Sequence, residues 1–333
     1  MNKGTFNLAP LGILASGANL QPGMVGMANS ELMADTFFSE PMTEYAVGWR
    51  TEDNRLEDLL EALAPSVRTA DRFEYRVADN AAAFAAIENK ADERALNGEF
   101  KTIMAHGQIE NGATLSKGLT TVIDKRIVQA NPRAIEEKVG WLKRMLLRAE
   151  ILRAVALLNA NATNKAVTWG GDSGSQPDMD LAAMVLAGGD AAGFDPNTIV
   201  MPAKVWQNRL LAYGAVNTSA GFAGYAMTPD GLRDWLAIDR VYVSRERYGN
   251  GTATAKNPIL GTNVAFAFNA QRDATPEDPS NIKRFWSPEQ GGGEWAVWVQ
   301  DKSSHLVYVT VSHYSAIAIT SSLGIRKLTV TAG

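Results

Sequence analysis

The chain has 333 residues, of which 46% are hydrophobic and 20% charged, as in a globular protein of two domains or one extended domain. It contains no cysteine, which excludes disulfide frameworks, thiolate catalysis and cysteine-based zinc sites. A formal net charge of −4 and the lack of a basic tail argue against a dedicated nucleic-acid binder, although such a chain can still line a container of DNA. No apolar run reaches the roughly 18 residues of a membrane span.

The amino-terminal segment, residues 1–45, is rich in glycine, alanine, serine and methionine and shows no helical or strand period. Its stretch from Leu8 to Leu20 is mildly apolar, but only Lys3 precedes it, so we interpret it as part of a flexible arm and not as a signal peptide. A segment that cannot bury its own apolar groups needs another surface. We therefore expect this arm to lie on a neighbouring subunit.

The next segment combines a strand, a helix and turns. Residues 72–77 alternate between aromatic or aliphatic and charged side chains, which predicts a half-buried strand. Residues 81–96 follow a helical pattern that ends at Gly98. Polar sequence comes after it, and we expect a turn at Asn111-Gly112.

A long helix is predicted from Pro132 to about Ala160. Asn131 is a suitable cap, and proline at the first helical position loses no hydrogen bond. An apolar stripe repeats at helical spacing and consists of Ile135, Val139, Leu142, Leu146 and Ala149. The opposite, polar face consists of Glu136, Glu137, Lys143, Arg144, Arg148 and Arg153. At about 1.5 Å per residue the helix is roughly 40 Å long, and we interpret it as a structural spine.

Beyond Gly170 the pattern predicts a mixed α/β module followed by strands. The predicted helices are 178–187, 203–212 and 230–236, and the predicted strands are 198–201 and 240–244. From Gly293 the sequence is rich in β-branched and aromatic residues, with strands expected at 295–299, 306–310 and 315–320.

One sequence motif suggests a hydrolase. Residues 171–174, Gly-Asp-Ser-Gly, copy the nucleophile signature of chymotrypsin-like serine proteases, and His106 lies upstream of Ser173. The triad needs a scaffold that brings base and nucleophile within hydrogen-bond reach. Here the long helix lies between them, where that family has barrel strands, so we expect no catalytic residue.

The remaining polar residues do not form a metal or cofactor pattern. His305 and His313 are eight residues apart, which on one unbroken strand separates them by roughly 27 Å, too far to share a metal. Only a hairpin between them would bring them together, and we interpret both as structural histidines. The carboxylate pairs Glu136/Glu137, Asp190/Asp195 and Glu277/Asp278 lack the spacing of metal loops. Residues 291–293, Gly-Gly-Gly, lack the lysine of a phosphate loop and indicate a hinge or exposed loop. We expect no catalytic, cofactor-binding or metal site.

Several segments of the chain have a composition typical of segments that bind other subunits. The apolar arm, the long polar region before the spine helix and the strand-rich tail all present surfaces that need covering. Such arms and strand edges are normally matched by strand addition or arm exchange between subunits. The residues alone therefore predict a self-assembling structural protein.

The chain resembles the major capsid proteins of tailed bacteriophages that have the Hong Kong 97 fold. The resemblance lies in residues 193–201, Gly-Phe-Asp-Pro-Asn-Thr-Ile-Val-Met, followed by the helix residues 205–210 with Trp206. The spine helix from Ala134 to Leu158 and the strand at 239–243 come in the family's order, and the match extends over roughly residues 65–270.

The resemblance implies an α+β capsid subunit built from a series of regions. In chain order these are an amino-terminal arm at 1–45, the start of a peripheral domain with an extended loop at 46–129, its spine helix at 130–165, an axial domain at 166–280 and returning strands at 281–333. It also implies assembly as homopentamers and homohexamers into an icosahedral shell of the virion, in the cytoplasm of the host bacterium. The implied partners are scaffold and portal proteins and, weakly and without sequence preference, packaged double-stranded DNA.

Two variations within the family have no clear counterpart in this sequence. Some members join lysine to asparagine covalently. Lys90, Lys101 and Lys117 lie in the expected loop region, but no matching asparagine or glutamate is evident, so we expect no cross-link. Some members begin with a helical scaffolding segment of about a hundred residues, which is absent before this arm. We therefore expect either a separate scaffold protein or a chain numbered from a mature start, and Met1 favours the separate scaffold protein.

Three alternatives to a phage capsid protein remain open. An encapsulin, the shell protein of a bacterial nanocompartment, has the same fold. A serine hydrolase would use Ser173 and His106, and a tail-tube protein would form rings or tubes instead of closed shells.

Overall fold

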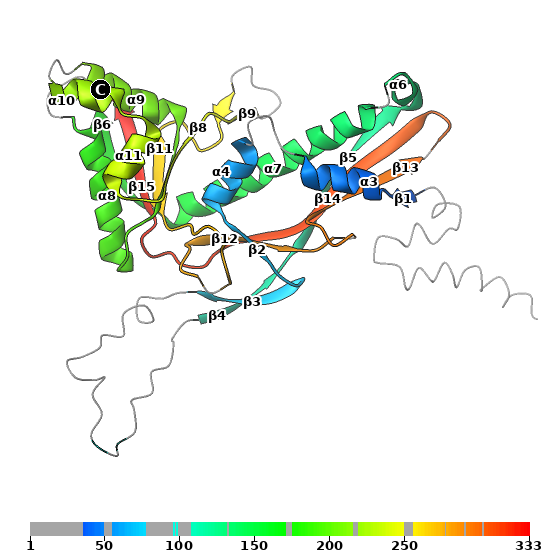
Figure 1. The fold of residues 1–333 in the computed structure, drawn as a ribbon, viewed down its shortest axis with the longest axis horizontal. Helices are drawn as coiled ribbons and strands as arrows, with labels where there is room; N and C mark the ends of the chain where they lie inside the picture. Colours follow the sequence, from blue (N-terminus) through cyan, green and yellow to red (C-terminus); the bar gives the residue numbers. More distant parts are fainter. Residues whose placement is uncertain are drawn as a thin grey trace, which may run out of the picture. The chain divides into compact units, whose positions relative to one another are not determined.

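The computed structural model describes residues 36–49, 55–77, 96, 98, 108–131, 133–170, 175–215, 219–249, 256–276, 278–289, 291–301 and 303–333 (Figure 1). The chain divides into two compact units, each assembled from three separate segments. The first unit comprises Met1–Arg50, Ser116–Leu146 and Pro288–Tyr314, and the second comprises Thr51–Leu115, Leu147–Ser287 and Ser315–Gly333. Residues 81–95 of the expected helix lie outside the described residues, as do residues 50–54, 78–95, 97 and 99–107 of the region 46–129 that contains the expected extended loop.

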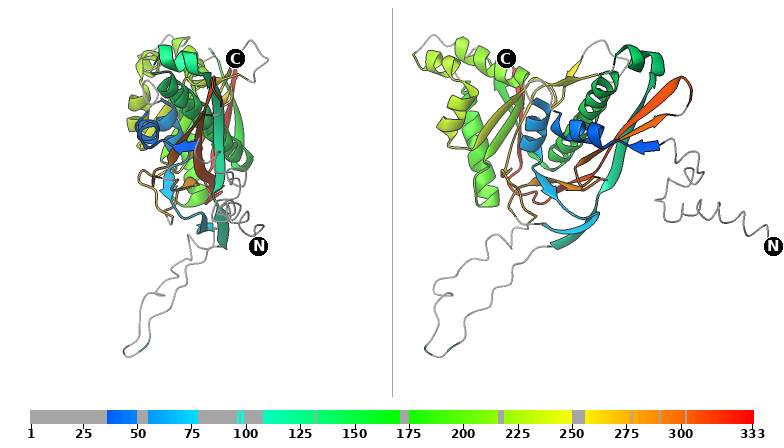
Figure 2. Two further views of the ribbon diagram at one scale, coloured as in Figure 1. Left: turned by 90° about the vertical axis from the view of Figure 1, so that its right-hand side faces the viewer. Right: turned by 45° about the vertical axis from the view of Figure 1, so that its right-hand side comes forward.

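The first unit contains a sheet in the order β1-β13-β14, with β5 also paired to β14. The strands are β1 (Thr36–Phe38), β13 (Trp295–Asp301), β14 (Leu306–Ile319) and β5 (Leu115–Asp124), of which β14 and β5 each extend past this unit at one end. The pairs β1–β13 and β13–β14 are antiparallel (Figure 2). In the second pair, Trp295 lies opposite His313.

Strand β14 is continuous, whereas we predicted two strands at 306–310 and 315–320. Alternate side chains along it are buried, in the set Val307, Val309, Val311, His313 and Ser315. The alternation of buried and exposed side chains thus continues across the residues between the two predicted strands. The predicted break was wrong because polar side chains occupy core-facing positions of the strand.

Among its described residues, the first unit has the helices α3 (Glu40–Gly48), α6 (Lys125–Ala130) and the amino-terminal part of α7 (Ala134–Asn161). Helix α6 was not predicted, and the Asp124 side chain caps it by accepting a hydrogen bond from the Arg126 amide at 2.8 Å. The Asn131 side chain accepts from the Arg133 amide at 3.0 Å, just before α7. This capping contact agrees with the predicted start of the spine helix.

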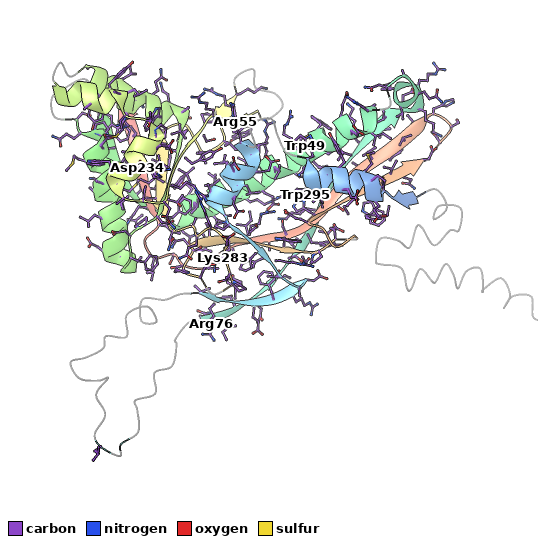
Figure 3. The ribbon with its side chains drawn as sticks, in the orientation of Figure 1. Trp49, Arg55, Arg76, Asp234, Lys283 and Trp295 are labelled. Atoms are coloured by element: carbon purple, nitrogen blue, oxygen red, sulfur yellow. The ribbon has the colours of Figure 1, made fainter. Side chains whose placement is uncertain are left out.

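Lys143 on α7 corrects one assignment, because we placed it on the polar face of the helix and it is only 4% exposed. Its ammonium donates hydrogen bonds to the carbonyls of Ala46 and Trp49, at 2.6 and 2.5 Å. The same group lies 5.6 Å from the ring centroids of Trp49 and Trp295 (Figure 3). Tertiary contacts with α3 and β13 therefore bury a charge that the helical pattern alone assigned to solvent.

The second unit contains a five-stranded sheet in the order β6-β15-β11-β7-β8. The strands are β6 (Thr163–Trp169), β15 (Arg326–Ala332), β11 (Val264–Phe268), β7 (Thr198–Pro202) and β8 (Arg240–Ser244). The two outer pairs, β6–β15 and β7–β8, are parallel, and the inner pairs are antiparallel. Every residue of β7 is buried, in agreement with the predicted buried strand at 198–201.

Four helices accompany this sheet: α8 (Pro177–Ala192), α9 (Ala203–Gly214), α10 (Ser219–Ala226) and α11 (Pro229–Leu236). Side chains of α8, α9 and α11 share one hydrophobic core with the sheet, including Leu181, Val205 and Leu232. We predicted α8, α9 and α11, but α10 was missed. Helix α8 also continues past its predicted end at Ala187 and stops at Gly193, which has a left-handed φ of 76°.

The predicted turn at Asn111-Gly112 was wrong. Both residues lie in β4 (Gln108–Ala113), which pairs antiparallel with β3 (Arg72–Val77), the strand that we predicted with these bounds. Gly112 lies opposite Phe73, and a Cβ at position 112 would come within 2.5 Å of the Phe73 ring. The glycine thus leaves space for the Phe73 ring on the paired strand. An Asn-Gly pair can therefore serve packing within a strand, although the same pair is typical of turns.

The second unit also contains the carboxyl-terminal part of α7, α4 (Arg55–Leu63) and four short strands: β2 (Ser66–Arg68), β9 (Arg247–Tyr248), β10 (Asn257–Pro258) and β12 (Ile282–Ser287). Strand β12 lies between the end of β14 and β2 and is parallel to β2. Among the described residues, no helix is long and apolar enough to span a membrane.

Candidate functional site

The residues considered for catalysis and cross-linking are mostly beyond the described ranges. Ser173 and the motif around it, His106, Lys90, Lys101 and Glu277 all lie outside the described residues. Lys117 is half-buried on β5. Residues 291 and 292 are exposed glycines with positive φ, in agreement with the expected exposed loop.

The two carboxyl-terminal histidines occupy different environments. His305 is exposed just before β14, and His313 is completely buried within that strand. The His313 ring lies 4.4 Å from the Trp295 ring, centroid to centroid. Because β14 runs without a break from Leu306, no hairpin brings the two histidines together. In the described part of the chain, no group of three or more histidine, aspartate or glutamate side chains is placed to hold a metal ion.

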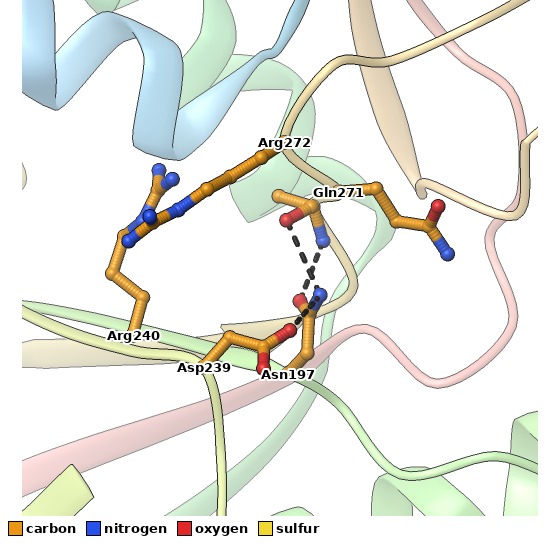
Figure 4. A pocket seen from close by; sticks show the side chains of 6 residues that line it. Asn197, Asp239, Arg240, Gln271 and Arg272 are labelled. Atoms are coloured by element: carbon orange, nitrogen blue, oxygen red, sulfur yellow. Dashed lines mark hydrogen bonds between the residues drawn. The ribbon is translucent and has the colours of Figure 1, made fainter.

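Asn197 is the central residue of a hydrogen-bond cluster at one end of the five-stranded sheet (Figure 4). Its side-chain amide donates to the Asp239 carboxylate at 3.0 Å and to the Ala270 carbonyl at 3.3 Å. Its side-chain oxygen accepts from the Ala270 amide at 2.8 Å and from the Thr198 hydroxyl at 2.9 Å. The Asn197 carbonyl accepts from the amides of Asp239 and Arg240. One asparagine therefore joins the start of β7 to the start of β8 and to the segment after β11.

This cluster gives a physical reason for the Pro-Asn-Thr passage that carried the sequence resemblance. An asparagine side chain offers both donors and an acceptor, and here all of its capacity is used between three chain segments. The passage was identified from the sequence as a family marker. The contacts of Asn197 with Asp239 and Ala270 span 42 and 73 residues, so the neighbouring sequence could not predict them.

A buried ion pair joins helices α8 and α9. The Arg209 guanidinium donates two hydrogen bonds to the two carboxylate oxygens of Asp178, at 2.6 and 2.8 Å. The Arg209 side chain is fully buried, and its charge lies 4.6 Å from the Trp206 ring centroid and 5.1 Å from that of Tyr213. Bidentate geometry with aromatic stacking fixes the two helices in a specific arrangement. Neither residue was identified from the sequence.

A second buried cation holds a loop of the second unit. The Lys283 ammonium on β12 donates to the carbonyls of Thr275, Pro276 and Asp278, at 2.8, 3.1 and 2.8 Å (Figure 3). The Asp278 carboxylate lies 3.2 Å from the same ammonium. The Lys283 ammonium thus supplies hydrogen-bond donors to three loop carbonyls that would otherwise lack them.

Large apolar side chains are exposed on both units. On α8, Met179 and Leu186 are 55% and 61% exposed and lie on one face of the helix, with the exposed Ala183 between them. The other exposed members in the second unit are Leu96, Ile109, Leu115, Phe194, Leu211, Tyr225 and Trp235. Those in the first unit are Val47, Val122, Ile127, Trp141, Met145 and Leu306. Single exposed apolar side chains are common on protein surfaces, so only adjoining ones, such as Met179 and Leu186 on α8, bear on partner binding.

Tyr242 on β8 supplies a pH-dependent contribution to stability. Burial, and then the negative charges of Asp58 and Glu246, raise its pKa from 10.0 to about 12, and its hydroxyl donates to the Arg55 carbonyl at 2.9 Å. Between pH 10 and 12 the unfolded chain loses this proton while the folded chain keeps it, so stability falls as pH rises. Denaturant titrations at pH 9 and 11.5 measure how far the free energy of unfolding falls between these pH values. We expect this fall to be about 1 kcal/mol smaller in Tyr242→Phe, a value that is reduced because the side chain is partly exposed. The exposed Tyr225→Phe is the control, and equal pH slopes for both variants would contradict the assignment.

The order of elements agrees with the sequence resemblance. Spine helix α7 is followed by β7 after Pro196 and Asn197, by α9 with Trp206, and by β8. Among solved structures, the chain is similar to a phage-related protein from Bordetella bronchiseptica RB50, with a TM-score of 0.62. The sequence identity is 14%, and the match covers 87% of this chain and 96% of that one. The chain has the Hong Kong 97 capsid fold.

Two other solved structures are similar to the chain at lower scores. A putative prophage capsid protein from Escherichia coli CFT073 has a TM-score of 0.49 and 11% identity, over 89% of this chain and 99% of that one. A virus-like particle protein from Pyrococcus furiosus also has a TM-score of 0.49 and 11% identity, over 87% and 98%. No protein-family model and no curated protein sequence matches the chain. At 14% identity, the likeness to the phage-related protein concerns the fold alone.

Proposed function

We propose that the chain is the major capsid protein of a tailed bacteriophage. In this proposal it assembles as homopentamers and homohexamers into the icosahedral shell that encloses a double-stranded DNA genome. The observation that carries the proposal is the capsid fold, matched over 96% of the phage-related protein's length. The exposed apolar side chains of both units support it, because a shell subunit must bury surface against its neighbours.

The proposal assigns a role to each region of the chain. Residues 1–45 form the amino-terminal arm, 46–129 the start of the peripheral domain and the extended loop, 130–165 the spine helix, 166–280 the axial domain and 281–333 the returning strands. One boundary between the two compact units lies within α7, between Leu146 and Leu147. The proposed regions therefore do not coincide with the compact units. No catalytic residue is assigned.

The net charge of −4 suits a container for DNA. Lysine and arginine side chains that neutralise phosphates bind DNA by releasing counterions, so a mildly acidic wall holds its cargo only weakly. In the proposal, scaffold and portal proteins are the further partners, and shells form in the host cytoplasm before they become part of the virion.

Size-exclusion chromatography of the expressed chain tests the proposal, with mass spectrometry of the particle contents. We expect the chain, alone or after its scaffold protein is added, to elute as particles of megadalton mass, far above its 35.9 kDa, without an enzyme cargo. An encapsulin has the same fold and is the second candidate; a co-purifying ferritin-like or peroxidase cargo would favour it. Stacked rings or tubes in place of closed particles would favour a tail-tube protein.

A further inference from the structure

A polar pocket lies beside the Asn197 cluster in the second unit. It has a volume of about 440 Å³ and is lined by Asn197, Asp239, Arg240, Ala270, Gln271 and Arg272. Arg240 begins β8 and Arg272 follows β11, and Figure 4 shows their guanidinium groups directed toward the same space. The hydrogen bonds of Asn197 to Asp239 and Ala270 fix the segments that carry both arginines.

Within the described part of the chain, neither guanidinium makes an ion pair or a side-chain hydrogen bond. Each guanidinium has five N–H donors in a planar fork that matches a carboxylate or a phosphate. Arg240 is half-buried, and burial followed by the charge of Arg272 lowers its pKa, while Glu61, Asp58 and Asp239 act in the opposite direction. Two like charges that face each other without partners are stabilised when an anion lies between them.

The surrounding charges select the kind of anion. The carboxylates of Asp58, Glu61 and Asp239 are close enough to influence Arg240, so the site is not broadly cationic. A DNA backbone carries a line of phosphates, and these three carboxylates would repel it. The same carboxylates also oppose a single incoming carboxylate, but less than a line of phosphates, because its one charge can lie between the two guanidinium groups. A pocket of about 440 Å³ has room for an acidic side chain.

We propose that this pocket receives an aspartate or glutamate side chain from a second copy of the chain, whose carboxylate bridges Arg240 and Arg272. The inference rests on the proposed self-assembly and adds to it a specific, charge-dependent contact. The chain carries 36 acidic against 32 basic residues, so each copy has acidic side chains to offer to its neighbour. A guanidinium pair in a fixed pocket gives such a contact a defined position as well as attraction.

The test compares Arg272→Glu with Arg245→Glu by sedimentation velocity over a range of concentrations. Arg245 is also exposed and lies in the same unit, so the control makes the same change of charge. We expect Arg272→Glu to raise the concentration needed for assembly at least about tenfold relative to the control. Arg272→Gln should act in the same direction with a smaller effect, and equal melting temperatures would show that both variants fold.

Each other outcome overturns the inference in a distinguishable way. If the wild-type chain assembles and Arg272→Glu assembles as readily as Arg245→Glu, the contact is wrong and the proposed function stands. A wild-type chain that forms no oligomer, either alone or after its scaffold protein is added, overturns both. If Arg272→Glu weakens binding of the assembled shell to a DNA duplex but leaves assembly unchanged, the occupant is a phosphate.

Discussion

Replacement of Arg209 by methionine is expected to lower the free energy of unfolding by about 3–5 kcal/mol. The substitution keeps much of the side-chain volume but removes the cation that Asp178 binds through two hydrogen bonds. The Asp178 carboxylate is only 9% exposed, so it would remain as a buried charge without its partner. The stacking of the guanidinium on Trp206 and Tyr213 would also be lost.

Urea titration followed by circular dichroism measures this change. Lys204→Met is a matched control, because Lys204 is exposed on the same helix, and it should alter the free energy by no more than about 0.5 kcal/mol. The double variant Arg209→Met with Asp178→Leu should recover most of the loss, since no buried charge remains. An Arg209→Met protein as stable as the Lys204→Met protein would contradict the buried ion pair.

Replacement of Asn197 by alanine is expected to lower the free energy of unfolding by about 2–4 kcal/mol. It removes the acceptor of the buried Ala270 amide and the donor of the Ala270 carbonyl, and both backbone groups then lose their partner. It also removes the contacts with Asp239 and Thr198. The starts of β7 and β8 would still be joined by the hydrogen bonds of the Asn197 backbone.

Thermal melting of Asn197→Ala checks this value against Asn257→Ala, an exposed asparagine of the same unit. Asn197→Asp adds a sharper comparison. It keeps an acceptor for the Ala270 amide but places a second carboxylate against Asp239, so the variant should gain stability as pH falls toward 4. Melting temperatures that match the control at every pH would show that the cluster does not hold these segments together.

Much of the fold could be predicted because its strands and helices follow clean periods. The bounds of β3 and β8 agree with the prediction, and α7, α9 and α11 agree closely. Two of the errors have the same physical origin, which is contact between residues far apart in the sequence. Lys143 is buried by carbonyls at positions 46 and 49, and Gly112 makes room for the Phe73 ring. The hydrophobic pattern of a short segment cannot predict contacts with residues that lie far away in the sequence.

The candidate site was less accessible than the fold. The Pro-Asn-Thr passage was recognised as a family marker, yet the role of Asn197 depends on Asp239 and Ala270. Arg209 lies among apolar residues of α9 at positions 205 and 212, which is a weak signal for a buried charge. Arg240 and Arg272 belong to separate elements, and only the tertiary structure places them at one pocket.

Negative-stain electron microscopy of the expressed full-length chain tests the central claim most directly. The capsid proposal predicts closed icosahedral shells, or the five- and six-membered rings from which they are built, either from the chain alone or after its scaffold protein is added. A chain that stays a monomer of 35.9 kDa under both conditions would contradict the proposal. In that case the hydrolase hypothesis on Ser173 and His106 would need to be tested with a Ser173→Ala variant.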